Sequence, residues 1–205
     1  DEMIYHCRAV SRGSTRAHIV GDLPFGSYQS SYEEAMRSGI RMMKEGGVQS
    51  LKLEGGERVA EIVEGLSQSG IPVMGHLGLT PQSVHQLGGY RVQGRGEQAA
   101  EELIREALIL QEAGAYSLVL ESVPAKLAKQ VTDELNIPTI GIGAGAGCSG
   151  QVLVLYDLLG LDERFKPTFL KKYRNFAFEV KSAVEEYASE VKERVFPGDE
   201  HSHKG

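Results

Sequence analysis

Five polar residues with the chemistry of an active site lie in or just after short apolar runs of the sequence. They are Asp22, Lys52, Glu54, His76 and Glu121. Carboxylate oxygens are the ligands that hard divalent cations prefer. Glutamate and histidine side chains serve as general acids and bases, and a lysine ammonium can neutralise an anionic group. These residue types indicate metal-assisted or acid–base chemistry, provided that the fold brings them together.

Each of the five also has a structural explanation when it is taken alone. Asp22 precedes a Leu-Pro pair and could be a turn former. Lys52 and Glu54 lie two residues apart, on one face of a strand, and could form an ion pair without a catalytic role. His76 could be an ordinary hydrogen-bonded histidine, and Glu121 could cap the helix that follows it. Chance is a poor explanation for five such residues along one edge of a sheet, so together they favour an active site.

The elements that would position these residues alternate between short strands and longer helices. The predicted strands cover residues 18–22, 50–54, 71–75, 117–121, 137–142 and 152–155, and the predicted helices cover 31–44, 57–69, 97–113 and 124–135. This alternation is typical of βα units around a parallel sheet. The five residues then fall at or near the carboxyl ends of strands, the edge that carries active sites in barrels and open α/β sheets alike.

Six predicted strands leave two architectures open. A closed eight-stranded barrel typically needs ~250 residues, so a chain of 205 residues would lack the first barrel strands. An open doubly wound sheet would need no further strands. We expect one barrel domain over residues 1–197 and a flexible tail over 198–205. Residues 168–194 carry apolar side chains at steps of three and four, which predicts an amphipathic helix against the barrel or a neighbouring subunit.

The composition argues against several classes of partner. The formal net charge is −6 and the basic residues are scattered, which does not favour binding to nucleic acid. No apolar run reaches the ~18 to 20 residues needed to cross a membrane, so we expect a soluble protein. The two cysteines, Cys7 and Cys148, are too few for a disulfide scaffold and indicate a reducing compartment.

Four sequence blocks carry a family resemblance. They are residues 51–57 (LKLEGGE), 75–83 (GHLGLTPQS), 88–94 (GGYRVQG) and 141–145 (GIGAG). In this order the blocks resemble the signature segments of the ketopantoate hydroxymethyltransferases, and the resemblance extends from about Asp1 to about Ser202. It implies an α/β fold, the (β/α)₈ TIM barrel of the phosphoenolpyruvate/pyruvate-domain type, with the first strands absent from this chain.

The resemblance also implies an activity and an assembly. Members of the family transfer a hydroxymethyl group from 5,10-methylenetetrahydrofolate to 3-methyl-2-oxobutanoate, which gives 2-dehydropantoate for pantothenate synthesis. They use a divalent cation, usually Mg²⁺, and usually assemble as homodecamers. We therefore expect small-molecule substrates, a homo-oligomer, and a location in the cytoplasm, or in mitochondria if the organism is eukaryotic.

The resemblance assigns a role to each of the five residues. Asp22 and Glu54 correspond to metal-site carboxylates, and Asp22 and Lys52 to residues that contact the oxo acid. Glu121 corresponds to the proposed general base, and His76 to a histidine of the same pocket. The residue types suit this chemistry, because removing a proton beside a ketone places enolate charge on oxygen, where a hard cation can stabilise it.

Two departures from the family pattern bear on these roles. The family's Gly-Asp-Ser strand, with another metal-site aspartate and a serine that contacts substrate, has no counterpart in this chain. Ser122 stands where many members have cysteine, which we interpret as a tolerated packing change.

Two rival hypotheses belong to other functional classes. The Gly141-x-Gly143 pattern could indicate a dinucleotide oxidoreductase, but that fingerprint requires a helix directly after the glycines, and the apolar run 152–155 predicts a strand instead. The other rival is a non-catalytic chain that only assembles.

Overall fold

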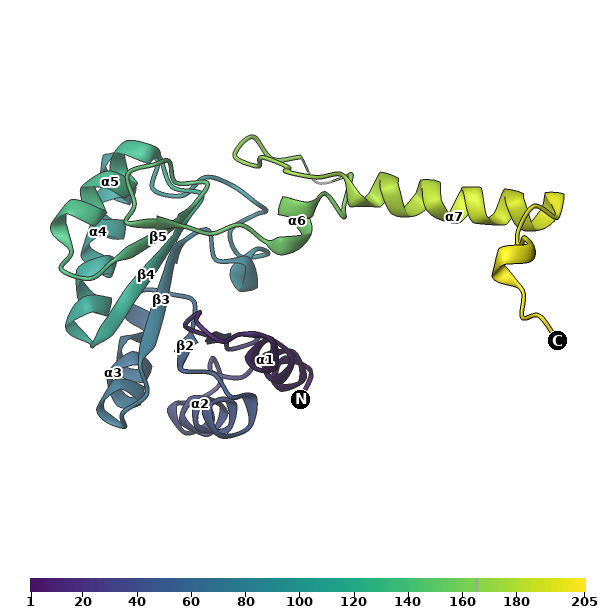
Figure 1. Ribbon diagram of the computed structural model, residues 1–205. Helices are drawn as coiled ribbons and strands as arrows, with labels where there is room; N and C mark the ends of the chain where they lie inside the picture. The colour runs from purple at the N-terminus through teal and green to yellow at the C-terminus, as the bar shows by residue number, and fades with distance from the viewer. Residues whose placement is uncertain (165) are drawn as a thin grey trace. The chain divides into compact units, whose positions relative to one another are not determined.

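The computed structural model describes residues 1–164 and 166–205, which form two compact units (Figure 1). In the unit Asp1–Val152, the strands are β1 (Val20–Asp22), β2 (Ser50–Lys52), β3 (Val73–Gly78), β4 (Ala115–Glu121), β5 (Thr139–Ile142) and β6 (Gly150–Gln151). Its helices are α1 (Glu2–Gly13), α2 (Tyr32–Gly46), α3 (Ala60–Gln68), α4 (Glu97–Glu112) and α5 (Ala125–Glu134), with 3-10 turns η1 (Glu57–Val59) and η2 (Pro81–Ser83). The unit Leu153–Gly205 contains α6 (Leu155–Leu159), α7 (Phe176–Glu193) and the 3-10 turn η3 (Asp199–His201).

The strands follow one another across the sheet in sequence order. Among the described residues the sheet has six strands in the order β1-β2-β3-β4-β5-β6, and every neighbouring pair is parallel. A doubly wound sheet reverses its strand order at a switch point, and this sheet has no reversal. The order is that of consecutive strands in a (β/α) barrel, which confirms the predicted fold class.

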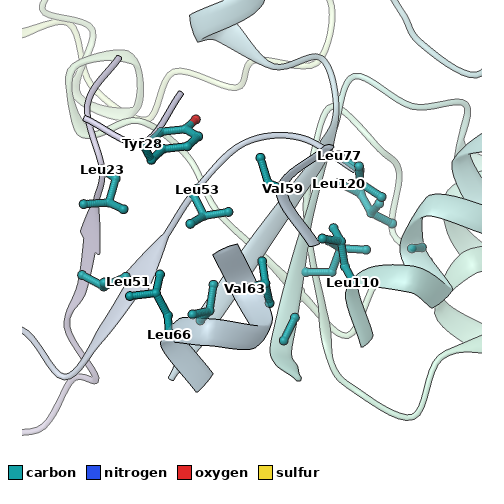
Figure 2. Packing of buried hydrophobic residues seen from close by; sticks show 14 of the residues in the cluster. Leu23, Tyr28, Leu51, Leu53, Val59, Val63, Leu66, Leu77, Leu110 and Leu120 are labelled. Carbon is teal, nitrogen blue, oxygen red and sulfur yellow. The ribbon is translucent and has the colours of Figure 1, made fainter. Parts of the chain in front are cut away.

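Strand alternation separates the hydrophobic core from the polar residues. Successive side chains of a strand point to opposite faces, so the fully buried Leu51 and Leu53 face away from Lys52 and Glu54. Leu51 of β2 and Leu66 of α3 both pack against Gly39 of α2. A Cβ added to Gly39 would lie within 3 Å of both leucine side chains. Figure 2 shows this packing around Leu51, Leu53, Val63 and Leu66. One face of the sheet therefore packs against the helices, and the other face carries the polar residues Lys52 and Glu54.

Helix α2 shows how local signals position the first two strands. The Ser31 hydroxyl accepts a hydrogen bond from the Glu34 amide at 3.2 Å, and Gly47 ends the helix with a positive φ of 70°. A capping hydroxyl satisfies a free amide at the helix start, and glycine tolerates the left-handed conformation at the end. These two local signals therefore set the start and the end of α2, the helix that connects β1 to β2.

On the C-terminal side, one predicted element is wrong and another begins later than predicted. The sixth strand is Gly150–Gln151, and the predicted strand at 152–155 is instead an extended segment that leads into α6. Three of its apolar side chains, Val152, Val154 and Leu155, are exposed, and a short apolar run does not by itself distinguish a strand from other structures. The predicted helix over 168–194 begins only at Phe176, because the Tyr173 amide donates instead to the Leu158 carbonyl, at 2.9 Å.

Other parts of the chain differ from the prediction in smaller ways or stay untested. Helix α1 lies where we predicted no element. One domain over residues 1–197 and a flexible tail over 198–205 remain predictions; within that tail, Asp199–His201 form the turn η3. No helix among the described residues combines the length and apolar composition that a membrane span requires.

Gly78 should be the most sensitive glycine at the functional edge. Its φ is +88°, and an added Cβ would collide with the Glu121 carbonyl oxygen. We expect Gly78→Ala to lower the free energy of unfolding by about 1–2 kcal/mol through the left-handed backbone and by about a further 1–3 kcal/mol through overpacking. Urea unfolding measures the loss. Gly70→Ala is the matched control, because Gly70 has φ +81° with no atom within 4 Å; equal losses in the two variants would contradict the predicted collision.

Candidate active site

The structure brings the five predicted residues together at the carboxyl edge of the sheet. Asp22, Lys52 and Glu121 are the last residues of β1, β2 and β4, His76 lies within β3, and Glu54 follows β2 by two residues. Adjacent strands place them side by side, because Asp22 pairs in register with Lys52, and His76 with Val119. The argument from a shared edge is confirmed for all five.

Lys52 lies at the centre of the cluster. Its Nζ is 2.8 Å from Asp22 Oδ1, 3.9 Å from Glu54 Oε1 and 3.2 Å from His76 Nδ1. An ammonium can only donate hydrogen bonds. His76 Nδ1 must therefore accept from it, which assigns the ring proton of a neutral imidazole to Nε2.

His76 connects Lys52 to Glu121. The Nε2 atom of His76 lies 3.3 Å from Glu121 Oε2, and the His76 side chain is only 3% exposed. The contact is close, but its angle is not that of a hydrogen bond, and Nε2 has no other hydrogen-bond partner among the described residues. Catalytic hydrogen bonds are often poorly aligned before substrate binds. The Nε2 proton is thus placed to stabilise the Glu121 carboxylate.

Glu54 is a buried carboxyl with several partners. Burial raises its pKa above the ordinary 4.5, although the backbone amide of Gln82 and the ammonium of Lys52 act to lower it. Its Oε2 accepts a hydrogen bond from the Gln82 amide at 2.9 Å, while Oε1 faces His76 Nδ1 at 3.8 Å. One oxygen is held by the backbone, and the other is turned to the cluster.

The raised pKa of Glu54 predicts how the metal-free protein responds to pH. A carboxyl that binds its proton more tightly in the folded state costs stability as pH rises from 4.5 through its folded pKa. Glu54→Gln removes this titration. The free energy of unfolding of the variant, relative to the parent, should therefore increase as pH rises from 4.5 towards neutrality.

Urea unfolding over a pH series measures this difference. Glu45→Gln is the control of opposite sign, because a hydrogen bond from Arg41 lowers the pKa of Glu45. That variant should lose stability relative to the parent as pH rises towards 4.5. A flat difference for Glu54→Gln would mean that its carboxyl has the same pKa in the folded and unfolded states.

The donor set is compatible with a hard divalent cation, although it is incomplete as a protein-only site. Among the described residues, no group of three or more His, Cys, Asp or Glu side chains is arranged to hold a metal. Asp22 Oδ1 is buried and, despite the nearby Lys52, has no hydrogen bond of good geometry within the described chain. Mg²⁺ typically takes one or two carboxylates and completes its shell with water and substrate oxygens. Asp22 and Glu54 fit that pattern.

The net charge of the side chains in the cluster also favours a bound divalent cation. With all three carboxyls ionised and His76 neutral, Asp22, Glu54 and Glu121 outnumber the single ammonium of Lys52 by two negative charges. Clustered carboxylates repel one another and disfavour the ionised state. A bound divalent cation would remove this excess.

Ser122 follows Glu121 in an unusual backbone conformation. Its φ is +51°, a left-handed value that is uncommon outside glycine. Two backbone hydrogen bonds hold it there: its amide donates to the Ile142 carbonyl and its own carbonyl accepts from the Gln93 amide, both at 2.9 Å. Strained residues often adjoin functional groups, and this one fixes the chain directly after Glu121.

Sequence reasoning did not identify two further residues at the edge, Tyr28 and Gln82. The Tyr28 hydroxyl accepts from the Glu54 amide at 3.1 Å, and burial raises its pKa to about 12. Gln82 lies within the block 75–83 that carried the resemblance. The resemblance therefore marked this segment as important, but it gave Gln82 no role. Tyr28 offered no comparable signal.

The segment after β5 does not have the form of a dinucleotide site. That fingerprint needs its glycines to lead straight into a helix. Here Gly143 and Gly145 have positive φ values of 62° and 76°, and the chain continues to strand β6. The structure therefore gives no support to the oxidoreductase hypothesis.

Comparison with known proteins gives the family and the fold. A family model described as ketopantoate hydroxymethyltransferase matches residues 1–199. Proteins named 3-methyl-2-oxobutanoate hydroxymethyltransferase from Syntrophus aciditrophicus and Leptospira interrogans are 56% and 55% identical to this chain, over 98% of it and 74% and 77% of their own lengths.

Among solved structures, a protein described as "a putative phosphonomutase from Burkholderia cenocepacia J2315" aligns with a TM-score of 0.53 at 14% identity. The alignment covers 94% of this chain and 75% of that one, a likeness that speaks for the barrel fold alone. The sequence matches show the family, because they run at more than half identity over 98% of this chain. The chain belongs to the ketopantoate hydroxymethyltransferase family of enzymes.

Proposed function

We propose that this chain transfers a hydroxymethyl group from 5,10-methylenetetrahydrofolate to 3-methyl-2-oxobutanoate, giving 2-dehydropantoate for pantothenate synthesis. The observation that carries the proposal is the unbroken series of contacts Asp22–Lys52–His76–Glu121 along one sheet edge. In a member of this family, the cluster supplies a base (Glu121), an ammonium group (Lys52) and a pair of carboxylates (Asp22 and Glu54).

Glu121 is the base in this proposal. Its carboxylate takes the proton from C3 of the oxo acid, and negative charge develops on the oxygen at C2. The Nε2 atom of His76 lies 3.3 Å from Glu121 Oε2, so its proton can stabilise the carboxylate once substrate brings the two groups into line. Glu121 is mostly shielded from water, with 17% of its side chain exposed.

Asp22 and Glu54 are the residues that would hold Mg²⁺ or another divalent cation. When bound, the cation supplies a Lewis acid for negative charge on the substrate oxygens. Lys52 balances the Asp22 carboxylate and gives the substrate carboxylate a cationic partner. The C3 carbon then bonds to the methylene carbon of the folate, and water supplies the hydroxyl oxygen as tetrahydrofolate leaves.

Nuclear magnetic resonance in D₂O tests the proton step separately from the transfer. The purified chain with Mg²⁺ should exchange the C3 proton of 3-methyl-2-oxobutanoate without any folate, and should form 2-dehydropantoate when methylenetetrahydrofolate is added. A folded chain that did neither would support the non-catalytic alternative and refute the proposal. Exchange without product would leave the base assignment standing and refute this one-carbon donor.

We further propose that the chain assembles as a homo-oligomer, a decamer by family resemblance, in the cytoplasm or in mitochondria of a eukaryote. Helix α7 supports the assembly, because it carries exposed Val180, Val184 and Tyr187 at steps of three and four. Exposed apolar groups of this kind mark contact surfaces. A monomer by light scattering at micromolar concentration would refute the assembly, and recovery from another compartment on fractionation would refute the location.

A further inference from the structure

Tyr28 and Gln82 form a closed ring of hydrogen bonds with Glu54. The Glu54 amide donates to the Tyr28 hydroxyl at 3.1 Å, and that hydroxyl donates to Gln82 Oε1 at 2.8 Å. The Gln82 amide completes the ring by donating to Glu54 Oε2 at 2.9 Å. The Tyr28 hydroxyl also lies 3.4 Å from the Glu54 carbonyl, but its single proton belongs to the shorter contact.

The ring fixes which oxygen of Glu54 faces the site. Oε2 is engaged by the Gln82 amide, so Oε1 is the oxygen turned towards Lys52 and His76. Glu54 is 3% exposed and Tyr28 is 2% exposed, so water does not compete for these bonds. A carboxylate held in this way presents one oxygen in one direction.

Gln82 also connects the ring to Asp22. Its Nε2 donates to the Leu23 carbonyl at 2.8 Å, and Leu23 directly follows Asp22. The residue thus contacts the segment after β1 through its side chain and the segment after β2 through its backbone. These are the two segments that carry the proposed metal carboxylates.

We infer that Tyr28 and Gln82 are positioning residues, which hold Glu54 and Asp22 at the separation and orientation needed to share one divalent cation. The inference rests on the proposed function, because it requires those carboxylates to bind the cation. Groups that hydrogen-bond to metal ligands typically change metal affinity 10- to 100-fold when they are removed.

A purely structural role is the competing explanation, since Tyr28 is among the large, fully buried side chains of the core. The hydroxyl separates the two roles. Tyr28→Phe keeps the ring that packs and removes only the atom that joins Glu54 to Gln82. A packing role would survive this change, and a positioning role would not.

Binding of Mn²⁺ to the purified chain, followed by electron paramagnetic resonance, gives a readout that does not depend on catalysis. Tyr28→Phe should raise the Kd for Mn²⁺ by about 10-fold, the lower end of the range, because the hydroxyl bonds the Glu54 amide and the Gln82 side chain and not the carboxylate itself. Its C3 proton exchange should recover at high Mg²⁺, because the base Glu121 is untouched. Tyr116→Phe is the matched control: its hydroxyl contacts Ser50 Oγ at 2.9 Å, at the start of β2 and away from the carboxyl edge. Its Kd should stay within about twofold of the parent.

Gln82→Ala is the second variant, for use if Tyr28→Phe fails to fold. Gln82 is partly exposed, so its side chain can be truncated with little loss of packing, and its backbone bond to Glu54 is kept. It too should weaken Mn²⁺ binding. A parent chain that bound no Mn²⁺ would refute the proposed metal site and this inference together. A parent that bound Mn²⁺ while both variants matched its Kd would refute the inference alone.

Discussion

Glu121→Gln is expected to lower the rate of C3 proton exchange in 3-methyl-2-oxobutanoate by about 10²–10⁴-fold, the usual contribution of a general base. The amide keeps the size of the side chain and its contact with His76, whose Nε2 lies 3.3 Å from Glu121 Oε2. It cannot take the proton. Exchange in D₂O, followed by nuclear magnetic resonance without folate, measures this step directly.

Glu101→Gln provides the control for Glu121→Gln. Glu101 lies on the exposed surface of α4, so the same chemical change there should leave the exchange rate unaltered. Exchange at the parental rate in Glu121→Gln would show that another group is the base.

Asp22→Asn is expected to raise the Kd for Mg²⁺ by at least about 10–100-fold, the range already seen when only the partner of a metal ligand is removed. The variant replaces a charged oxygen ligand by a neutral amide and leaves Lys52 without its 2.8 Å partner. The Asp22 side chain is 41% exposed, so the fold should tolerate the change. Isothermal titration with Mg²⁺ measures the affinity, and circular dichroism checks the fold.

Excess Mg²⁺ should separate the two variants. A weakened metal site can be refilled by mass action, so proton exchange in Asp22→Asn should partly recover, whereas Glu121→Gln should not respond. Asp133→Asn is the control, because the Asp133 carboxylate pairs with Lys129 on the exposed side of α5. Rescue of both variants, or of neither, would show that Asp22 and Glu121 do not divide the roles as proposed.

The sequence predicted the strands that carry the site because their signal is local. Strand β4 contains the apolar run Leu118–Leu120 directly before Glu121, and such runs are typical of buried parallel strands. Once the strands are parallel and ordered, their carboxyl ends share an edge, and the contacts among Lys52, His76 and Glu121 follow from that geometry alone.

Tyr28 and Gln82 could not be predicted in the same way. Tyr28 lies in the connection between β1 and α2, and Gln82 lies in the short turn η2, so no long helical or strand period constrains either side chain. Their partners are 26 to 54 residues away in the chain, so the contacts depend on the path of two loops. The start of α7 was misplaced for a related reason, since a backbone bond from Tyr173 to Leu158 overrode the apolar period.

The sequential strand order also has a consequence for how the site arises during synthesis. The ion pair of Lys52 with Asp22 joins β1 to β2, the bond from Lys52 to His76 joins β2 to β3, and the contact of His76 with Glu121 joins β3 to β4. Each contact therefore closes between one βα unit and the next to leave the ribosome. Chains can fold from the N-terminus as they emerge, so these contacts become possible in the order in which the strands are synthesised. The residues proposed to hold the cation are in place first, and the base arrives last, with β4.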